Sequence, residues 1–271
     1  MDLLADENTR GSLLAGGTDL IVQWESGVLR APERVISIKG LPELEGIREV
    51  EGCIHVGALV THAELRRSAL VRQHLPALAA AAATVGGPQI QALGTIAGNV
   101  ANASPAGDLA PALLITDGSV VVAGVDGERA VKLTDFFLRY REIDLGPKEL
   151  IVRFELPKRT NAQAEAFRKL GPRAAQAISK VMAAHRATVQ GGMVQSCALA
   201  IGSVAPTVVR LPGFESWIVG KPLTEETFRA AEKKVAGEVR PIDDIRSTGE
   251  YRKWVSGRIV RGFLQDLAES R

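Results

Sequence analysis

Two short segments rich in small residues hold the residue types of this chain that are best suited to bind a ligand. The first is Ala15-Gly16-Gly17-Thr18-Asp19, which lies between the apolar pair Leu13-Leu14 and the apolar run Leu20-Ile21-Val22. Successive glycines let the backbone turn tightly and bring its N–H groups close to an anion such as a diphosphate. Thr18 adds a hydroxyl donor. Taken alone, the segment is also compatible with an ordinary Gly-Gly turn.

The second segment covers residues 94–108 and mixes hydrogen-bonding side chains with glycine and alanine. Its polar side chains belong to Thr95, Asn99, Asn102, Ser104 and Asp108. Small neighbours leave room for a ligand beside such groups, and a long loop of this composition is typical of binding sites. A polar Ω-loop without a ligand is the alternative.

Several familiar site types are absent from the sequence. No Gly-Lys-Ser/Thr follows either glycine segment and neither reads G-x-G-x-x-G, which excludes the Walker loop and the dinucleotide fingerprint. Cys53 and Cys197 lack Cys-x-x-Cys spacing, so we expect reduced thiols rather than a disulfide or an iron–sulfur ligand set. No catalytic residue and no metal site are predicted, because no metal-binding spacing connects the histidines His55, His62, His74 and His185.

The elements that would position these segments follow from the hydrophobic pattern. Short β-branched stretches predict strands at 35–38, 54–58, 120–124 and 149–156, with a further strand beginning at Val131. Thr61 followed by Glu64 is typical of a capping box, and the alanine-rich stretch 75–85 favours a helix. Residues 86–111 show no sustained period and predict a long loop region. Residues 157–163 predict a linker before a second α+β unit with helices at 224–236 and 249–270.

The composition is that of a globular protein with a sizeable core. The chain has 271 residues, 46% of them hydrophobic, and 33 basic against 31 acidic side chains give a formal charge of +2. The basic residues are scattered, so nucleic acid is not expected as a partner. No apolar run reaches the roughly 18–20 residues that span a bilayer, and the start of the chain lacks a leader pattern. These features favour a cytoplasmic protein without a membrane partner.

Both segments together resemble the paired signature of the FAD-binding (medium) subunits of the molybdenum hydroxylases, which include xanthine, carbon monoxide and nicotine dehydrogenases. The resemblance continues in order through nearly the whole chain. It includes Asp135-Phe136-Phe137, Glu149-Leu150-Ile151, Ala166-Phe167-Arg168-Lys169, Gly202 to Thr207, Pro241-Ile242-Asp243-Asp244 and Tyr251-Arg252.

This resemblance implies a mixed α/β (α+β) fold and an FAD site. It implies a two-part FAD-binding domain over residues 1–158 and a smaller α+β C-terminal domain over residues 162–271 that covers the flavin. It also implies that the two loops hold the FAD diphosphate with backbone amides and small polar side chains. Carried over by position, the cofactor-binding residues are Ala15, Gly16, Gly17, Thr18, Asp19, Thr95, Gly98, Asn99, Asn102 and Asp108, with Leu150 or Ile151 as an apolar contact under the flavin ring and Lys169 as a basic neighbour. For Lys169, a solvated lysine is the alternative.

The chain departs from the family pattern close to these loops. The family usually has Ile-Arg-Asn before the second loop, where this chain has Gln91 and Ala92 after the isoleucine, so a positive charge is missing. Ala97 replaces the first glycine of Gly-Gly-Asn and adds a methyl group. Arg139 and Ile143 are bulkier than the usual glycine and threonine. The first glycine loop also lies about 20 residues nearer the start of the chain than in the resembled proteins.

Two hypotheses follow. In the first, the chain is the electron-transferring FAD subunit of a heterotrimer with an iron–sulfur subunit and a molybdopterin subunit, so that the flavin passes electrons to an external acceptor. In the second, it is a stand-alone paralogue that uses the cleft as a non-redox cyclase or isomerase on a small apolar metabolite, with FAD weakly bound or absent. Retention of most polar groups in both loops favours the first.

Overall fold

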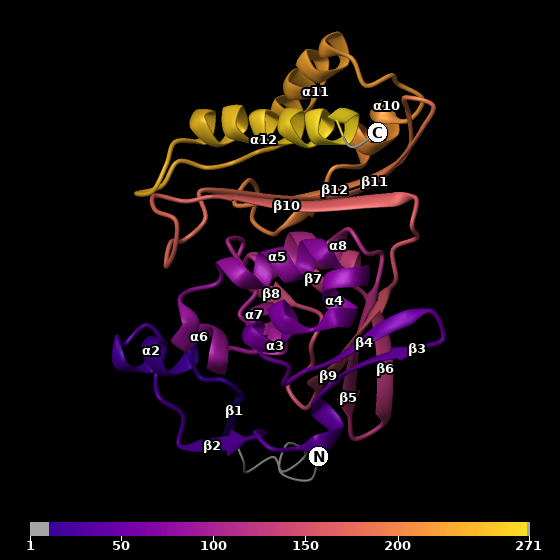
Figure 1. Cartoon of the computed structure of the whole chain (residues 1–271). Coiled ribbons are helices and arrows are strands. Elements are labelled where there is room, and N and C mark those ends of the chain that lie inside the picture. Colours follow the sequence, from indigo (N-terminus) through magenta and orange to yellow (C-terminus); the bar gives the residue numbers. More distant parts are fainter. Residues whose placement is uncertain (1–10, 270–271) are drawn as a thin grey trace.

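The structure is a computed structural model that describes residues 11–269. It consists of two domains stacked on one another (Figure 1), which we call the N-terminal domain (residues 11–157) and the C-terminal domain (residues 163–269). Strand β10 (Gln163–Leu170) runs along the boundary between them. The mixed α/β class expected from the sequence is confirmed.

The N-terminal domain begins with a small β-α-β unit that carries the first glycine segment. Strands β1 (Gly11–Leu14) and β2 (Arg34–Ser37) form a parallel pair, and helix α2 (Leu20–Glu25) connects them. The segment 15–19 is therefore the turn between a strand and the start of a helix. None of the side chains of α2 is buried, so this unit lies at the surface.

A five-stranded antiparallel sheet forms the base of the N-terminal domain. The strand order is β3-β4-β9-β5-β6, with β3 at Ile47–Val50, β4 at Cys53–Gly57, β5 at Ser119–Gly124, β6 at Gly127–Lys132 and β9 at Leu150–Pro157. The strand expected from Val131 starts at Gly127 instead, because β5 and β6 stay paired down to the Gly124–Gly127 turn. A 3-10 turn (Pro42–Leu44), α9 (Leu133–Phe136) and the short pair β7 (Phe137–Arg139) and β8 (Glu142–Ile143) complete this part.

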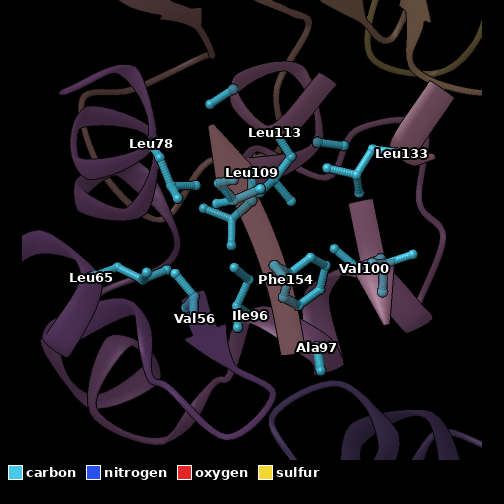
Figure 2. Close-up of a cluster of buried hydrophobic side chains, with 14 of the residues drawn as sticks. Val56, Leu65, Leu78, Ile96, Ala97, Val100, Leu109, Leu113, Leu133 and Phe154 are labelled. Carbon is cyan, nitrogen blue, oxygen red and sulfur yellow. The ribbon is translucent and has the colours of Figure 1, made fainter. Parts of the chain in front are cut away.

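Short helices cover one face of the sheet and enclose the main core. They are α3 (His62–Arg67), α4 (Ala69–His74), α5 (Pro76–Thr84), α6 (Pro88–Leu93), α7 (Ile96–Ala101) and α8 (Leu109–Leu114). Figure 2 shows Leu78, Leu109 and Leu113 from the helices gathered near Phe154 of the sheet. The expected capping box is present, because the Thr61 hydroxyl accepts from the Glu64 amide and the Glu64 carboxylate accepts from the Thr61 amide.

The interpretation of residues 86–111 as a long loop was wrong. The segment folds into α6, α7 and the start of α8, helices of six residues each. The Thr95 cap and the burial of Ile96, Val100 and Leu109 stabilise α7 and α8, while in α6 the buried residue is Gln91, which donates to carbonyls at the end of α5. Tertiary packing therefore overrides local preference here.

The C-terminal domain is a four-stranded antiparallel sheet with helices on its outer face (Figure 1). The strand order is β10-β11-β12-β13, with β11 at Val181–Gln190, β12 at Met193–Gly202 and β13 at Val209–Arg210. The helices are α10 (Pro212–Ile218), α11 (Glu225–Glu238, capped by Thr224) and α12 (Gly249–Glu269). A second core, which includes Phe214 and Phe263, lies between these helices and the sheet.

Strand β10 forms hydrogen bonds to both ends of helix α5. The Glu165 carboxylate accepts a hydrogen bond from the Ala77 amide at the start of α5 (3.4 Å), and the Lys169 ammonium donates to the Thr84 carbonyl at its end (3.1 Å). An acidic group at a helix start and a basic group at its end both complement the helix dipole. Glu165 also forms an ion pair with Arg186 (2.5 Å), and both side chains are buried. The charged side chains of Glu165 and Lys169 therefore join the C-terminal domain to helix α5 of the N-terminal domain.

Candidate functional site

The two ligand-suited segments lie against each other. A Cβ atom on Gly16 would come within 2.1 Å of the Leu93 carbonyl oxygen and 3.0 Å of the Gly94 Cα, so the first loop touches the backbone that opens the second. Farther along, the Asn102 amide donates to the Asp19 carboxylate at 3.2 Å. Gln23 donates to the Asn102 side-chain oxygen at 3.4 Å. Residues that are far apart in sequence therefore form one surface.

The first loop offers free backbone donors. The N–H groups of Gly16, Gly17 and Thr18 donate no hydrogen bond to any part of the chain that the structure describes. Gly17 has a φ of +72°, a conformation that glycine adopts without strain. A tight turn with unpaired amides and no Cβ atoms at its glycines is the arrangement that binds anions.

The second loop differs from the expectation that its backbone amides face a ligand. The Gly98 amide donates to the Thr95 hydroxyl (3.1 Å) as the cap of α7, and the Ala97 and Asn99 amides donate to the carbonyls of Ala58 and Thr95. What remains for a ligand on this loop is side-chain chemistry. The Asn99 side-chain oxygen is buried and has no hydrogen-bond partner among the described residues.

A cleft of about 260 Å³ opens beside the contact between the loops. It is smaller than most pockets for a whole small molecule, which hold roughly 300–1,000 Å³, and suits part of a larger ligand. Its lining includes Ala15, Gly16 and Thr95 from the predicted segments, and the charged side chains of Lys39, Glu45 and Glu64. Lys39 forms no ion pair with any described residue and is exposed. Sequence reasoning missed it, because a single lysine after a strand has no distinguishing pattern.

Asp108 and Lys169, predicted separately as cofactor neighbours, form an ion pair with each other at 2.6 Å across the domain boundary. Only 8% of the Asp108 side chain and 10% of the Lys169 side chain are exposed. Burial raises the pKa of the Asp108 carboxyl, while Lys169 and a hydrogen bond from Ser179 counteract that rise. Lys169 is therefore a paired, buried group, and the alternative of a solvated lysine does not hold.

Leu150 and Ile151 lie in β9 at the edge of the main core, 9% and 5% exposed. The structure gives each of them an apolar environment within the N-terminal domain. Neither residue is among the lining of the cleft, and their contact with a ligand stays a prediction.

The departures from the family pattern have local structural roles. Gln91 is buried and donates to the Ala83 and Val85 carbonyls at the end of α5 (both 3.1 Å). The Ala97 methyl group belongs to the main core and is 7% exposed, so most of it points away from solvent. Arg139 forms an exposed ion pair with Glu142, while Ile143 packs against the core. None of these side chains fills the cleft, whose lining includes only the small Ala92 from this group.

Comparison with known proteins decides the family. Residues 1–159 match the family described as the FAD binding domain in molybdopterin dehydrogenase, and residues 165–267 match the CO dehydrogenase flavoprotein C-terminal domain. The chain belongs to this flavoprotein family. As a member, it is an FAD-binding subunit of the molybdenum hydroxylases, an oxidoreductase component, and the resemblance seen in the sequence is confirmed.

Individual relatives agree with this assignment. The flavoprotein subunit is 37% identical over 266 residues to the nicotinate dehydrogenase FAD-subunit of Eubacterium barkeri, covering 95% of this chain and 88% of that protein. It is 32% identical to a putative xanthine dehydrogenase FAD-binding subunit of Escherichia coli K12, covering 93% and 86%. Its structure matches carbon monoxide dehydrogenase from Hydrogenophaga pseudoflava with a TM-score of 0.92 and 30% identity, covering 96% and 90%.

Nothing in the comparisons favours the stand-alone cyclase or isomerase. Over the described residues, no group of three or more His, Cys, Asp or Glu side chains could hold a metal ion. The helices of the same region include none that is long and apolar enough to cross a membrane.

Proposed function

We propose that this flavoprotein subunit binds the FAD diphosphate between its two loops and holds the cofactor at the boundary of its two domains. The contacts come from the Gly16, Gly17 and Thr18 amides, from the side chains of Thr95, Asn99 and Asn102, and from the positive charge of Lys39. Ala15, Asp19 and Gly98 shape the walls, with Leu150 or Ile151 as the apolar contact. The observation that carries the proposal is the contact of the first loop, whose amides are unpaired among the described residues, with the backbone that opens the second loop.

The residues present fit such a cofactor. Anions bind well to unpaired backbone amides in a glycine turn, and Lys39 places a cation in the cleft lining, together with Glu45 and Glu64. Bound FAD supplies the electron-transfer chemistry of the subunit. The protein contributes binding, orientation and electrostatics, so no residue of this chain is assigned a catalytic role.

We further propose that residues 1–158 form the FAD-binding domain and residues 162–271 the domain that covers the flavin. The partners would be an iron–sulfur subunit and a molybdopterin subunit in a heterotrimer, located in the cytoplasm. Support comes from the names of relatives, which include a medium chain of carbon monoxide dehydrogenase and a medium subunit of nicotine 6-hydroxylase.

The direct test is to purify the chain, add FAD and measure the dissociation constant from the quenching of flavin fluorescence. We expect saturable binding with flavin absorption bands at close to one equivalent per chain. Gly98→Val should abolish binding, because an added Cβ would lie 3.0 Å from the Thr95 hydroxyl and the branched side chain would disturb the Thr95 cap that shapes the second loop. Cys53→Ser, in the sheet on β4, should bind FAD like the parent. If Gly98→Val binds FAD as well as the parent, the site is misplaced.

Lys39 provides a second arm of the test. Lys39→Gln removes the cation from the cleft and should weaken FAD binding several-fold, with an effect that shrinks as salt concentration rises. Lys233→Gln, an exposed lysine of helix α11 outside the cleft lining, is the matched control. Equal affinities for Lys39→Gln and the parent at low salt would remove Lys39 from the site.

A further inference from the structure

The end of the second loop is held from the C-terminal domain. The Ser179 hydroxyl donates to one Asp108 carboxylate oxygen at 2.5 Å, and Lys169 binds the other oxygen. Ser179 is 1% exposed. Hydrogen bonds to a buried carboxylate are among the strong ones, because the acceptor carries a full charge. The position of Asp108 is therefore set by two side chains of the other domain.

A second contact fixes the same stretch three residues earlier. The Ser203 amide donates to the Pro105 carbonyl at 2.8 Å. Ser203 has a φ of +63°, a strained conformation for a residue with a Cβ atom. The Ser203 hydroxyl donates to the Ser179 carbonyl (3.1 Å). The buried Arg252 guanidinium donates to the Ser203 carbonyl (2.9 Å). Strained backbone of this kind persists only where the surroundings hold it firmly.

The loop has little of its own to keep its shape. Within residues 104–108, the internal hydrogen bonds are those from the Ala106 and Gly107 amides to Ser104. The loop also passes through Ala103, whose φ is +48°. A backbone in that conformation costs about 1 kcal/mol or more unless other contacts hold it. The Ala103 amide donates to the Val100 carbonyl, and the contacts from the other domain reach Pro105 from Ser203 and Asp108 from Ser179 and Lys169.

We infer that Ser179 and Ser203 are positioning residues of the cofactor site, which act through Asp108 and Pro105 to shape the second loop. The inference rests on the proposed function for its effect on FAD. The C-terminal domain then has a role besides covering the flavin. Its side chains and backbone set the conformation of a loop that belongs to the N-terminal domain. FAD affinity should depend on hydroxyl groups that do not touch the cofactor.

The test compares Ser179→Ala with the matched control Ser256→Ala. Ser256 is also a fully buried serine of the C-terminal domain, but its hydroxyl donates within helix α12 to the Arg252 carbonyl. Both full-length variants are assayed for FAD dissociation constant, melting temperature and, without FAD, hydrogen exchange at the amides of Gly107 and Ala110. These amides bond to Ser104 and Gly107 within the loop region.

We expect Ser179→Ala to weaken FAD binding by about tenfold to a hundredfold, a range that corresponds to losing one charge-assisted hydrogen bond. Exchange at Gly107 and Ala110 should speed up, while amides of helix α11 keep the parent rate. Ser256→Ala should match the parent in affinity and loop exchange, even if its melting temperature falls. Ser179→Thr, which retains the hydroxyl, should restore most of the affinity.

The outcomes separate this inference from the proposed function. If the parent binds FAD and Ser179→Ala binds it equally well with unchanged loop exchange, the positioning role is overturned while the proposed function stands. If the parent binds no FAD, the proposed function fails, and the exchange measurement alone decides the positioning role. An equal affinity loss in Ser179→Ala and Ser256→Ala would show a general loss of stability and would also overturn the inference.

Discussion

The side-chain amide of Asn102 donates a hydrogen bond to the carboxylate of Asp19 at 3.2 Å, across 83 residues of sequence. This bond lies where the first glycine loop passes into α2 and where α7 ends. It ties together the two loops whose contact creates the candidate site. The Gln23 side chain completes the link by donating to the Asn102 oxygen.

Removing this link should loosen the site without unfolding the domain. We expect Asn102→Ala to weaken FAD binding about three- to tenfold, because an exposed hydrogen bond to a charged group contributes about 1 kcal/mol. Isothermal calorimetry with FAD measures the change. Asn161→Ala, in the exposed turn between β9 and β10, serves as the control and should leave the affinity unaltered. Parent-like affinity in Asn102→Ala would mean that the loops keep their contact without this bond.

Gly16 should tolerate no side chain. In Gly16→Ala the new Cβ would overlap the Leu93 carbonyl oxygen, and backbone on both sides must shift to relieve the overlap. We expect the midpoint of chemical denaturation to fall by an amount equivalent to about 1–3 kcal/mol, together with FAD affinity. Gly237→Ala, in helix α11 with open space around the added carbon, should instead stabilise by about 0.5–1 kcal/mol. A neutral Gly16→Ala variant would show that the loops are not in contact in solution.

The buried pair between Glu165 and Arg186 should be sensitive to the loss of one partner. Arg186→Met leaves the Glu165 carboxylate buried without its counter-ion, and such changes cost about 3–5 kcal/mol. Urea denaturation measures this loss. Arg229→Met removes an exposed partner of Glu225 on α11 and should cost less than about 0.5 kcal/mol. The prediction fails if the two variants are equally stable.

Stability should decline below neutral pH because of two buried histidines. Burial lowers the pKa of His62 to about 4 and, with a contribution from Arg168, that of His185 to about 4. Their unfolded-state pKa is about 6.5, so between these values the unfolded chain binds more protons than the folded one. Stability is therefore fully present above about pH 6.5 and is lost as the pH falls toward 4, by up to about 3 kcal/mol for each histidine.

Thermal melts from pH 7.5 to pH 4.5 test this behaviour. His185 packs against Phe263 in the second core, so His185→Leu keeps an apolar contact and removes one titrating group. We expect its melting temperature to fall less steeply with acid than that of the parent. His74→Leu, at the end of α4, is the control, because it removes a histidine other than the buried His62 and His185. Parallel curves for His185→Leu and the parent would contradict the assignment.

The sequence predicted those elements whose signals are local. The capping box at Thr61, the alanine-rich α5 and the long helix α12 follow from caps, propensity and periodicity, and each appears close to the expected bounds. The fold class and the FAD family followed from motifs spread along the chain. Helix α7 did not, because its stability comes from the burial of Ile96 and Val100 in the main core, and α6 did not, because its buried residue Gln91 is held by carbonyls at the end of α5.

The sequence named candidate residues for the site but did not indicate how they are arranged. The pairing of Asp108 with Lys169 joins residues 61 positions apart in different domains, and nothing in either segment indicates it. The engagement of the Gly98 amide by Thr95 likewise depends on a helix that the sequence did not predict. Lys39 enters the cleft because the chain turns back after β2, a matter of tertiary geometry alone.

The contacts of β10 with both ends of helix α5 limit which domains of two relatives can be combined in one hybrid protein. A hybrid that takes its C-terminal half from one relative and its N-terminal half from another keeps both helix ends satisfied only if an acid and a base occur at the spacing of Glu165 and Lys169. A hybrid should therefore take α5 and β10 from the same relative, because either element alone would bring an uncompensated charge to the domain boundary.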